Sequence, residues 1–285
     1  MSLSDLLDED EERLAKAGVE SARLDAEVIL SHVLGRERVD LYLDRASEPG
    51  DEAKQRFLEG IERRAAGCPV AYITGVKEFW SIPIRVSNDV LIPRPETELV
   101  VEEALKVAAA IGREGRIRIL DLCSGSGCIA AALATELPRA RLVLTDISDG
   151  ALEVAKSNLA FAGGRVEFFR GDLFDALPSS ETSFDVIVTN PPYIPTGHRG
   201  MLGREITDHE PEVALFGGKS GLDFAARIIE YAPRFLLPGG AMSMEMGLGQ
   251  SEKLEAMARE FGGYGRVEIS KDLAGIERVI TLWKS

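Results

Sequence analysis

The chain has 285 residues, of which 45% are hydrophobic, so it is long enough for one sizeable α/β domain and a smaller second domain. No apolar run approaches membrane-spanning length, and the acidic N-terminus is unlike a signal peptide, which predicts a cytoplasmic protein without membrane contacts. With 47 acidic and 33 basic residues, the net charge of −14 repels phosphates, so we expect a protein partner and no direct binding of nucleic acid.

Residues 1 to about 70 show the apolar spacing of helices, at intervals of three and four. Glycine and proline residues interrupt this pattern at 18, 35, 49–50 and 67, and thereby separate the helices. We therefore predict a small N-terminal helical bundle over residues 1–74. Its apolar stripes are formed by Leu3, Leu6, Leu7 and Leu14, then Leu24, Val28, Ile29 and Val33, and then Phe57, Leu58 and Ile61.

A hairpin and a helix start follow the predicted bundle. Residues 77–92 alternate between apolar and polar, which predicts a β-hairpin and a linker over residues 75–93. The next segment, Pro93-Arg94-Pro95-Glu96-Thr97-Glu98, has proline and acids where a helix commonly begins. Its alternative role is a lid over a ligand.

From Ile117 onward, predicted strands and helices alternate, which is typical of a mainly parallel sheet covered on both faces. We expect strands near 117, 141, 166, 184, 240, 264 and 277. Helices are expected after the first three strands and around 222–236 and 250–261. The last two strands are joined by Ser270 to Ile276, which is too short for a helical crossover, so they should form an antiparallel hairpin.

The stretch from Ile117 to Ala130 reads as a strand, a glycine turn and a helix. Gly125 and Gly127 allow a ligand to approach the backbone, and the helix offers free N–H groups at its start. The same spacing fits a dinucleotide-binding fingerprint, with Asp146 placed to bind a ribose, so a nicotinamide-dependent oxidoreductase is an alternative.

Asp121 favours a different ligand, because it stands directly before the glycine turn. A carboxylate there repels a pyrophosphate but can pair with a cationic amino acid group. S-adenosylmethionine carries both an ammonium and a sulfonium. We therefore favour this molecule as the cofactor of the predicted site.

The tetrapeptide Asn190-Pro191-Pro192-Tyr193 follows the apolar run Phe184 to Thr189. The Asn190 side-chain oxygen and the Pro191 carbonyl can each accept one N–H of a planar NH2 group, which directs the nitrogen lone pair at an electrophile. The ring of Tyr193 can stack on the same target, and the two prolines stiffen the turn. A methyl transfer to an amide or amino nitrogen needs this arrangement, whereas a hydride transfer does not.

Together these segments resemble class I S-adenosylmethionine-dependent methyltransferases, and more closely the release-factor glutamine N5-methyltransferases of the PrmC/HemK family. The resemblance runs from about residue 69 to the C-terminus. It implies a Rossmann-like, seven-stranded methyltransferase domain over residues 94–285, and a substrate-recognition role for the helices of residues 1–74. It is carried by residues 92–100, the glycine turn, Asn190 to Tyr193, and the segments 210–218, 221–223, 237–240 and 272–279.

The resemblance implies that the target is the glutamine of a Gly-Gly-Gln tripeptide in class I peptide-chain release factors. Catalysis is then expected from Asn190, Pro191 and Tyr193, with Pro192 also in contact with the substrate. Cys123 departs from the family pattern, which has glycine there, so a positive φ at this position is doubtful. The cofactor is expected to contact Asp121, Cys123, Ser124, Gly125, Ser126, Gly127, Asp146, Asp172, Leu173 and Asn190.

Three further features remain. The three cysteines and three histidines are scattered, so we predict reduced thiols and no metal site. Residues 196–221 lack periodicity and predict a long loop, which is either a lid or disordered. Glu245 is a charge within an apolar strand and predicts a strand-end salt bridge.

The sequence therefore predicts a protein-glutamine N5-methyltransferase. Alternatives are a glutamine methyltransferase for a ribosomal protein, and a DNA or RNA amino-methyltransferase, which shares the Asn-Pro-Pro-Tyr logic but needs a basic groove or a target-recognition insert.

Overall fold

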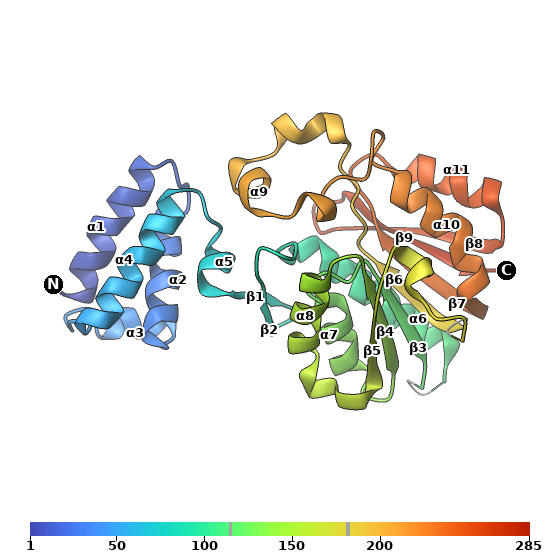
Figure 1. Ribbon diagram of the computed structural model, residues 1–285, viewed down its shortest axis with the longest axis horizontal. Helices are drawn as coiled ribbons and strands as arrows, with labels where there is room; N and C mark the ends of the chain where they lie inside the picture. Colours follow the sequence, from blue (N-terminus) through green and yellow to red (C-terminus); the bar gives the residue numbers. More distant parts are fainter. Residues whose placement is uncertain (114–115, 181–182) are drawn as a thin grey trace. The chain divides into compact units, whose positions relative to one another are not determined.

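A computed structural model describes residues 1–113, 116–180 and 183–285 of the chain (Figure 1). These residues form two compact units. The helical unit comprises Met1–Val76 together with Gly203–His209, and the sheet unit comprises Lys77–Leu202 and Glu210–Ser285. No helix of the described residues is both long and apolar enough to cross a membrane.

The helical unit contains more helices than the three whose apolar stripes the sequence shows. The first helix starts with a reciprocal capping box, in which Ser2 and Asp5 satisfy each other's backbone N–H. The short helices α3, α5 and α9 were not foreseen. The bounds are α1 Leu3–Lys16, α2 Ala22–Leu34, α3 Arg38–Leu43, α4 Asp51–Ala65, α5 Val70–Thr74 and α9 Arg204–His209.

The predicted stripe of α2 was partly wrong. Leu24 is 45% exposed, whereas Ala26, Ile29 and Leu30 are buried in the core of the helical unit. Alanine contributes to this core because its small side chain lets the helices approach closely, and a count of large apolar residues overlooks it. The stripe of α1 is confirmed, since Leu3, Leu6, Leu7 and Leu14 are all buried.

A buried arginine connects three elements of the helical unit. Arg64 of α4 donates from Nε to Asp25 of α2 at 2.6 Å, and from Nη2 to Glu205 of α9 at 2.6 Å.

The predicted long loop of residues 196–221 contains α9 and is therefore not structureless. It contains the 3₁₀ turns Thr196–Met201 and Glu212–Ala214 on either side of α9.

The sheet unit has the predicted seven-stranded sheet, in the order β5-β4-β3-β6-β7-β9-β8. Strands β3 to β7 pair in parallel, and β9 pairs antiparallel with both β7 and β8, as expected for the reversed final hairpin. The predicted fold class is confirmed. The strands are β3 Arg118–Leu122, β4 Arg141–Asp146, β5 Val166–Arg170, β6 Phe184–Thr189, β7 Leu236–Glu245, β8 Tyr264–Lys271 and β9 Glu277–Lys284.

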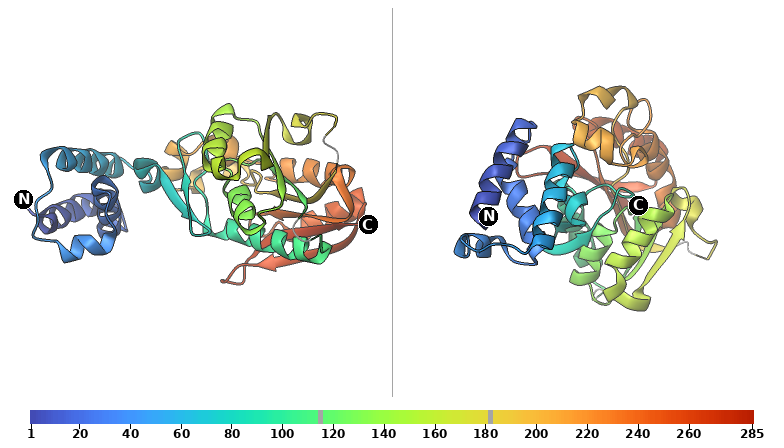
Figure 2. Two further views of the ribbon diagram at one scale, coloured as in Figure 1. Left: turned by 90° about the horizontal axis from the view of Figure 1, so that it is seen from below. Right: turned by 60° about the vertical axis from the view of Figure 1, so that its left-hand side comes forward.

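Helices cover both faces of this sheet (Figure 1). The helices α6, α7 and α8 lie side by side on one face, and α10 and α11 pack together over β7, β8 and β9 on the other. Figure 2 shows the same layers from two further directions. Their bounds are α6 Glu98–Ile111, α7 Cys128–Glu136, α8 Asp149–Asn158, α10 Asp223–Phe235 and α11 Ser251–Phe261.

The helix predicted directly after β5 is missing, since the described residues between β5 and β6 form no α-helix. That connection has only a 3₁₀ turn, Leu173–Ala176, before Pro178 ends the helical conformation. The hairpin is also shorter than predicted. It consists of β1 Val76–Phe79 and β2 Ile82–Arg85, and residues 86–94 form no strand.

The register of the parallel strands brings their carboxyl ends to one edge of the sheet. Leu122 at the end of β3 lies opposite both Thr145 of β4 and Thr189 of β6. On the far side of β6, Thr189 lies opposite Met244, so Glu245 stands beside Asn190. Ligands of open α/β sheets bind at this edge.

Candidate active site

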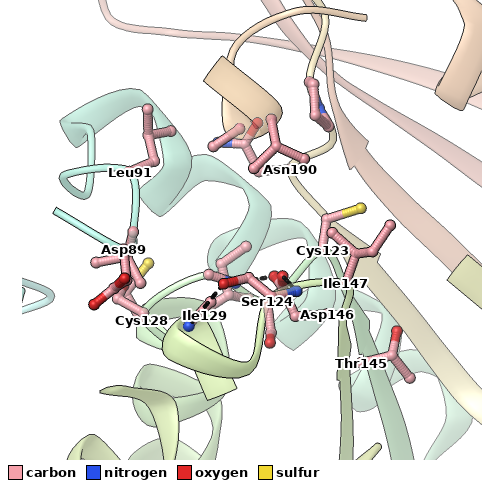
Figure 3. Close-up of a pocket in the computed structure, with 18 of the residues that line it drawn as sticks. Asp89, Leu91, Cys123, Ser124, Cys128, Ile129, Thr145, Asp146, Ile147 and Asn190 are labelled. Atoms are coloured by element: carbon pink, nitrogen blue, oxygen red, sulfur yellow. Dashed lines mark hydrogen bonds between the residues drawn. The ribbon is translucent and has the colours of Figure 1, made fainter. Parts of the chain in front are cut away.

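A cavity opens at the carboxyl edge of the sheet, within the sheet unit (Figure 3). Asn190 lies on one side of this cavity, and Ser124 and Asp146 lie on the other. Three acids, Asp89, Asp146 and Asp172, line it beside a single arginine, Arg94, so its charge favours a cationic ligand. The other lining residues are Val90, Leu91, Pro93, Thr97, Cys123 to Ser126, Cys128, Ile129, Thr145, Ile147, Ser148, Ala151, Gly171, Leu173, Asn190, Pro192, Val213, Ala214 and Phe224.

The glycine turn alternates residues of left-handed backbone between β3 and α7. Gly125 has a φ of +52° and Gly127 a φ of +73°, and Cys123 adopts +56° although it is not glycine. The doubt about a positive φ at Cys123 was therefore wrong. Gly127 is also closely packed, because a Cβ there would lie 3.1 Å from Ala155 and 3.2 Å from Leu159 of the α8 region.

Asp146 holds the glycine turn from the end of β4. Its Oδ2 accepts from the Gly125 amide at 2.9 Å, and its Oδ1 accepts from the Ser148 amide at 2.9 Å. Burial raises the pKa of Asp146, and these amides partly oppose that rise. Its carboxylate thus fixes the loop while it faces the cavity.

Asp172, the predicted adenine-side acid, follows β5. Both of its oxygens accept from the Arg227 guanidinium, at 3.1 Å and 2.9 Å, and Leu173 after it has a φ of +50°. This strained turn brings the backbone of residues 171–173 to the cavity wall.

Several buried oxygens near the glycine turn lack a hydrogen-bond partner. In the described part of the chain, such atoms are found on Asp121, Ser124 and Thr145. Burial raises the pKa of Asp121 well above its usual value, although the Ala130 amide partly stabilises the anion. Asp121 is only 1% exposed and is not among the lining residues, so it faces the turn from behind.

The Asn190–Tyr193 turn leaves β6, whose six residues are all buried. Pro191 and Pro192 are buried, while Asn190 is half-buried and faces the cavity. The chain after the turn is held by a short bridge, in which the Ile194 amide donates to the Leu215 carbonyl and the Gly217 amide donates to Ile194. The segment of residues 215–221 therefore braces the turn and is not a loose loop.

Two further residues support this turn from behind. Gln250 donates from Nε2 to the Tyr193 carbonyl at 3.0 Å, and accepts from the Gly247 amide at 2.8 Å. A Cβ at Gly217 would lie 2.3 Å from the Pro192 carbonyl oxygen, so only glycine fits there. The backbone of the turn is thereby fixed on both sides.

Glu245 ends β7 directly behind the Asn-Pro-Pro-Tyr motif. Its Oε2 accepts from the Thr97 hydroxyl at 2.6 Å, and its Oε1 accepts from the Tyr193 hydroxyl at 3.2 Å. The Thr97 hydroxyl in turn accepts from Asn190 Nδ2 at 3.0 Å. Glu245 therefore differs from the expected strand-end salt bridge, because both partners of its carboxylate are uncharged.

The structure brings most of the predicted site residues together. Asp121, Gly127, Pro191 and Tyr193 are not among the lining residues; they support those that are. Asp89, Arg94 and Thr97 line the cavity and were not assigned to the site, although the Pro93–Glu98 segment had suggested a lid. The predicted residues that line it are Cys123, Ser124, Gly125, Ser126, Asp146, Asp172, Leu173, Asn190 and Pro192.

Sequence comparisons identify the family. Residues 5–75 match the family model of the PrmC N-terminal domain, and residues 98–213 match that of the methyltransferase small domain. The chain is 43% identical to the release factor glutamine methyltransferase of Geobacter sulfurreducens, over 94% of this chain and 91% of that protein. The chain belongs to the release factor glutamine methyltransferase family. A second member, from Rhodopirellula baltica, is 38% identical over 95% of this chain and 92% of its own length.

Solved structures agree with this family's fold. A methyltransferase from Pyrococcus furiosus superposes with a TM-score of 0.51 at 19% identity, and covers 83% of this chain and 100% of its own. The hMettl16 catalytic domain gives a TM-score of 0.56 at 18% identity, and covers 85% of this chain and 84% of its own. Membership of the release factor glutamine methyltransferase family makes the chain a methyltransferase with S-adenosylmethionine as methyl donor.

The residues of the cavity fit this cofactor. The unpartnered hydroxyls of Ser124 and Thr145 line the wall and can bond a polar ligand. The lining acids suit the two positive centres of S-adenosylmethionine, and a Cβ built on Gly125 meets nothing within 4 Å, so the turn has open space beside it. No group of three or more metal-ligating side chains is found in the described ranges.

Proposed function

We propose that this chain transfers a methyl group from S-adenosylmethionine to the side-chain amide nitrogen of the glutamine in the Gly-Gly-Gln motif of class I peptide-chain release factors. The observation that carries the proposal is the Asn190–Tyr193 turn, which presents Asn190 to the same cavity as the glycine turn. Family membership supports the identity of the substrate.

The reaction requires a poor nucleophile to be oriented, because the lone pair of an amide nitrogen is delocalised into the carbonyl. The Asn190 Oδ1 and the Pro191 carbonyl each accept one N–H of the target glutamine, and this opposes the delocalisation. The bound cofactor supplies an electrophilic methyl group on its sulfonium. The positive charge that develops on the target nitrogen is stabilised by the two accepting oxygens, and the methylated amide then loses its extra proton to water.

The cofactor is held, in this proposal, by the predicted residues of the glycine turn and its neighbours. Ser124, Gly125 and Ser126 would contact the cofactor along the cavity wall, and Asp146 would bind its ribose. Asp172 and Leu173 would flank the adenine, and Asp121 would support the glycine turn from behind. Gly127 acts through packing, because it lets α7 and α8 approach each other.

The helical unit is proposed to recognise the release factor. It exposes apolar side chains one helical turn apart on α3, since Val39 is 60% exposed and Leu43 is 81% exposed. We expect Leu43→Asp to raise KM for the whole release factor severalfold and to leave the rate on a short Gly-Gly-Gln peptide unchanged. Equal effects on both substrates would contradict this role.

The partner and the compartment follow from the proposed reaction. A protein with a net charge of −14 suits a basic partner that acts on ribosomal RNA, and we propose no direct contact with nucleic acid. The enzyme is proposed to work in the cytoplasm, where release factors act.

One experiment tests the proposal against its alternatives. The protein is incubated with isotope-labelled S-adenosylmethionine and, in separate reactions, a class I release factor, ribosomal proteins and DNA. Mass spectrometry then locates the added methyl group. We expect the label on the glutamine of the Gly-Gly-Gln motif. Label on a ribosomal-protein glutamine or on a nucleobase, with none on the release factor, would overturn the proposal.

A further inference from the structure

The proposed reaction depends on which end of the Asn190 amide faces the target. Only the oxygen Oδ1 can accept an N–H of the target, whereas the NH2 end would oppose it donor to donor. The two ends have nearly the same shape, so packing alone does not distinguish them. The neighbouring hydrogen bonds must decide the orientation.

The chain of bonds behind Asn190 settles this orientation. The Thr97 hydroxyl has one hydrogen, and it donates that hydrogen to Glu245 Oε2 at 2.6 Å. Because an ionised carboxylate cannot donate, Thr97 can offer only a lone pair to its other neighbour. That neighbour must then be the NH2 of Asn190, which lies 3.0 Å from the Thr97 oxygen. The Asn190 oxygen is thereby left to face the target.

We propose that Glu245 and Thr97 are positioning residues for methyl transfer, with the Glu245 carboxylate fixing the Asn190 amide through the Thr97 hydroxyl. This inference rests on the proposed function and adds two residues to it, neither of which was assigned to the reaction. Glu245 is 2% exposed and Thr97 is 2% exposed, so water does not compete for these bonds.

The same carboxylate also fixes the motif's aromatic residue. The Tyr193 hydroxyl donates to Glu245 Oε1 at 3.2 Å, so this anion is bonded directly to one end of the Asn190–Tyr193 turn and through Thr97 to the other. The two oxygens of Glu245 have one hydroxyl donor each. This symmetry explains why an acid is required, because a glutamine offers one acceptor and one donor.

Protonation of Glu245 should reverse the chain of bonds. A neutral carboxyl group can donate to Thr97, which then donates its own hydrogen to Asn190 and favours the flipped amide. Burial raises the pKa of Glu245 to about 6, and the hydroxyls of Thr97 and Tyr193 oppose the rise. The other charged or titratable neighbours are Glu96 beside Thr97 and Arg278 of β9, together with the Cys128 thiol of α7.

Four variants test the inference on the full chain with saturating S-adenosylmethionine and a release factor. Glu245→Gln and Thr97→Val should each lower kcat roughly tenfold or more, with the dissociation constant of S-adenosylmethionine unchanged. Thr97→Ser keeps the hydroxyl and should restore kcat. Thr281→Val is the matched control, since it removes another buried threonine hydroxyl that bonds only Ser243 among the described residues, and it should leave kcat unchanged.

The pH profile separates positioning from a structural role. The wild type and Thr97→Ser should lose kcat as the pH falls through about 6, the value to which burial raises the pKa of Glu245, whereas Glu245→Gln should lack this limb. Full kcat in both Thr97→Val and Glu245→Gln would overturn the inference, as would an unchanged acid limb in Glu245→Gln.

A readout without catalysis distinguishes this inference from the proposed function. In protein labelled with ¹⁵N at asparagine side chains, the Asn190 NH2 resonances should shift as the pH falls through about 6, and this shift should be absent in Glu245→Gln. If the resonances behave in this way but no release factor is methylated, the proposed substrate fails and the positioning stands. If the release factor is methylated but the resonances of wild type and Glu245→Gln titrate alike, the positioning fails.

Discussion

The two sides of the cavity differ in how their buried polar groups are satisfied. On the glycine-turn side, the buried hydroxyls of Ser124 and Thr145, which line the cavity, have no hydrogen-bond partner in the described residues. On the Asn190 side, a continuous chain of hydrogen bonds runs from Asn190 through Thr97 and Glu245 to Tyr193. The polar groups of the glycine-turn side gain hydrogen-bond partners only from a ligand. The hydrogen bonds of the Asn190 side are already formed before any substrate binds.

This difference indicates a division of labour. A wall with unpartnered polar groups gains binding energy from a ligand, because it exchanges an unsatisfied group for a hydrogen bond. A preassembled network gains little on binding but fixes geometry, which lowers the barrier of the chemical step. Variants on the two sides should therefore fail in different ways.

The largest effect is expected at the centre of the Asn190 side. Asn190→Ala removes an acceptor for the target nitrogen, and methyl transfer should fall by about a hundredfold to a thousandfold. The dissociation constant of S-adenosylmethionine, measured by calorimetry, should change little. Weakened cofactor binding with a normal rate at saturation would mean that Asn190 serves cofactor binding and not methyl transfer.

Asp146→Ala should weaken cofactor binding by roughly tenfold to a hundredfold, because it removes the ligand's proposed ribose acceptor and releases the Gly125 amide. The rate at saturating cofactor should stay within a few-fold of the wild type. Asp149→Ala is a suitable control, since the Asp149 side chain is 69% exposed near the same strand end. An equal loss of affinity in both variants would point to a general effect of charge.

The buried carboxyl group of Glu245 makes the free energy of unfolding depend on pH. Burial raises the pKa of Glu245 from 4.5 to about 6, so the native state binds this proton more tightly than the unfolded state does. The resulting contribution is present at low pH and is lost as the pH rises through 6, and amounts to about 2 kcal/mol. The free energy of unfolding of the wild type, relative to Glu245→Gln, should fall by this amount between pH 4 and pH 7.5 in urea titrations. A constant difference between the two proteins across that range would mean that Glu245 titrates normally.

The smallest expected effect is a change in stability at the backbone of the glycine turn. Cys123 has a φ of +56°, where a side chain is strained and glycine is not. Both Cys123→Gly and Cys123→Ala remove the thiol, but only the first relieves the strain. Cys123→Gly should therefore be more stable than Cys123→Ala by about 1 kcal/mol in urea unfolding. An alanine variant of equal or greater stability would show that the turn is not strained.

The sequence predicted the sheet well because strands buried on both faces are continuous apolar runs that end in distinctive polar residues. Asp146, Asp172 and Asn190 could be placed at one edge for this reason, since parallel strands bring their carboxyl ends together. The helix expected after β5 is only the 3₁₀ turn Leu173–Ala176, because the residue before Pro178 is extended. The prediction that Leu24 is buried was wrong because α2 buries the smaller Ala26 in its place.

Nine of the 25 residues that line the cavity were also foreseen, but the hydrogen-bonded support behind Asn190 was not. Thr97 and Glu245 are 148 residues apart, and only the register of β6 with β7 brings the acid beside the Asn190 turn. A signal did exist in the sequence. Glu245 is an acid and the last residue of an apolar strand, as Asp146 is on its own strand, and this parallel would have assigned Glu245 to the site.

Methyl transfer in Asn190→Ala and Asp146→Ala, measured side by side in single turnovers over a range of S-adenosylmethionine concentrations, tests the division of labour most directly. We expect excess cofactor to restore the rate of Asp146→Ala to within a few-fold of the wild type and to leave that of Asn190→Ala depressed. Rescue of both variants by cofactor, or of neither, would contradict it.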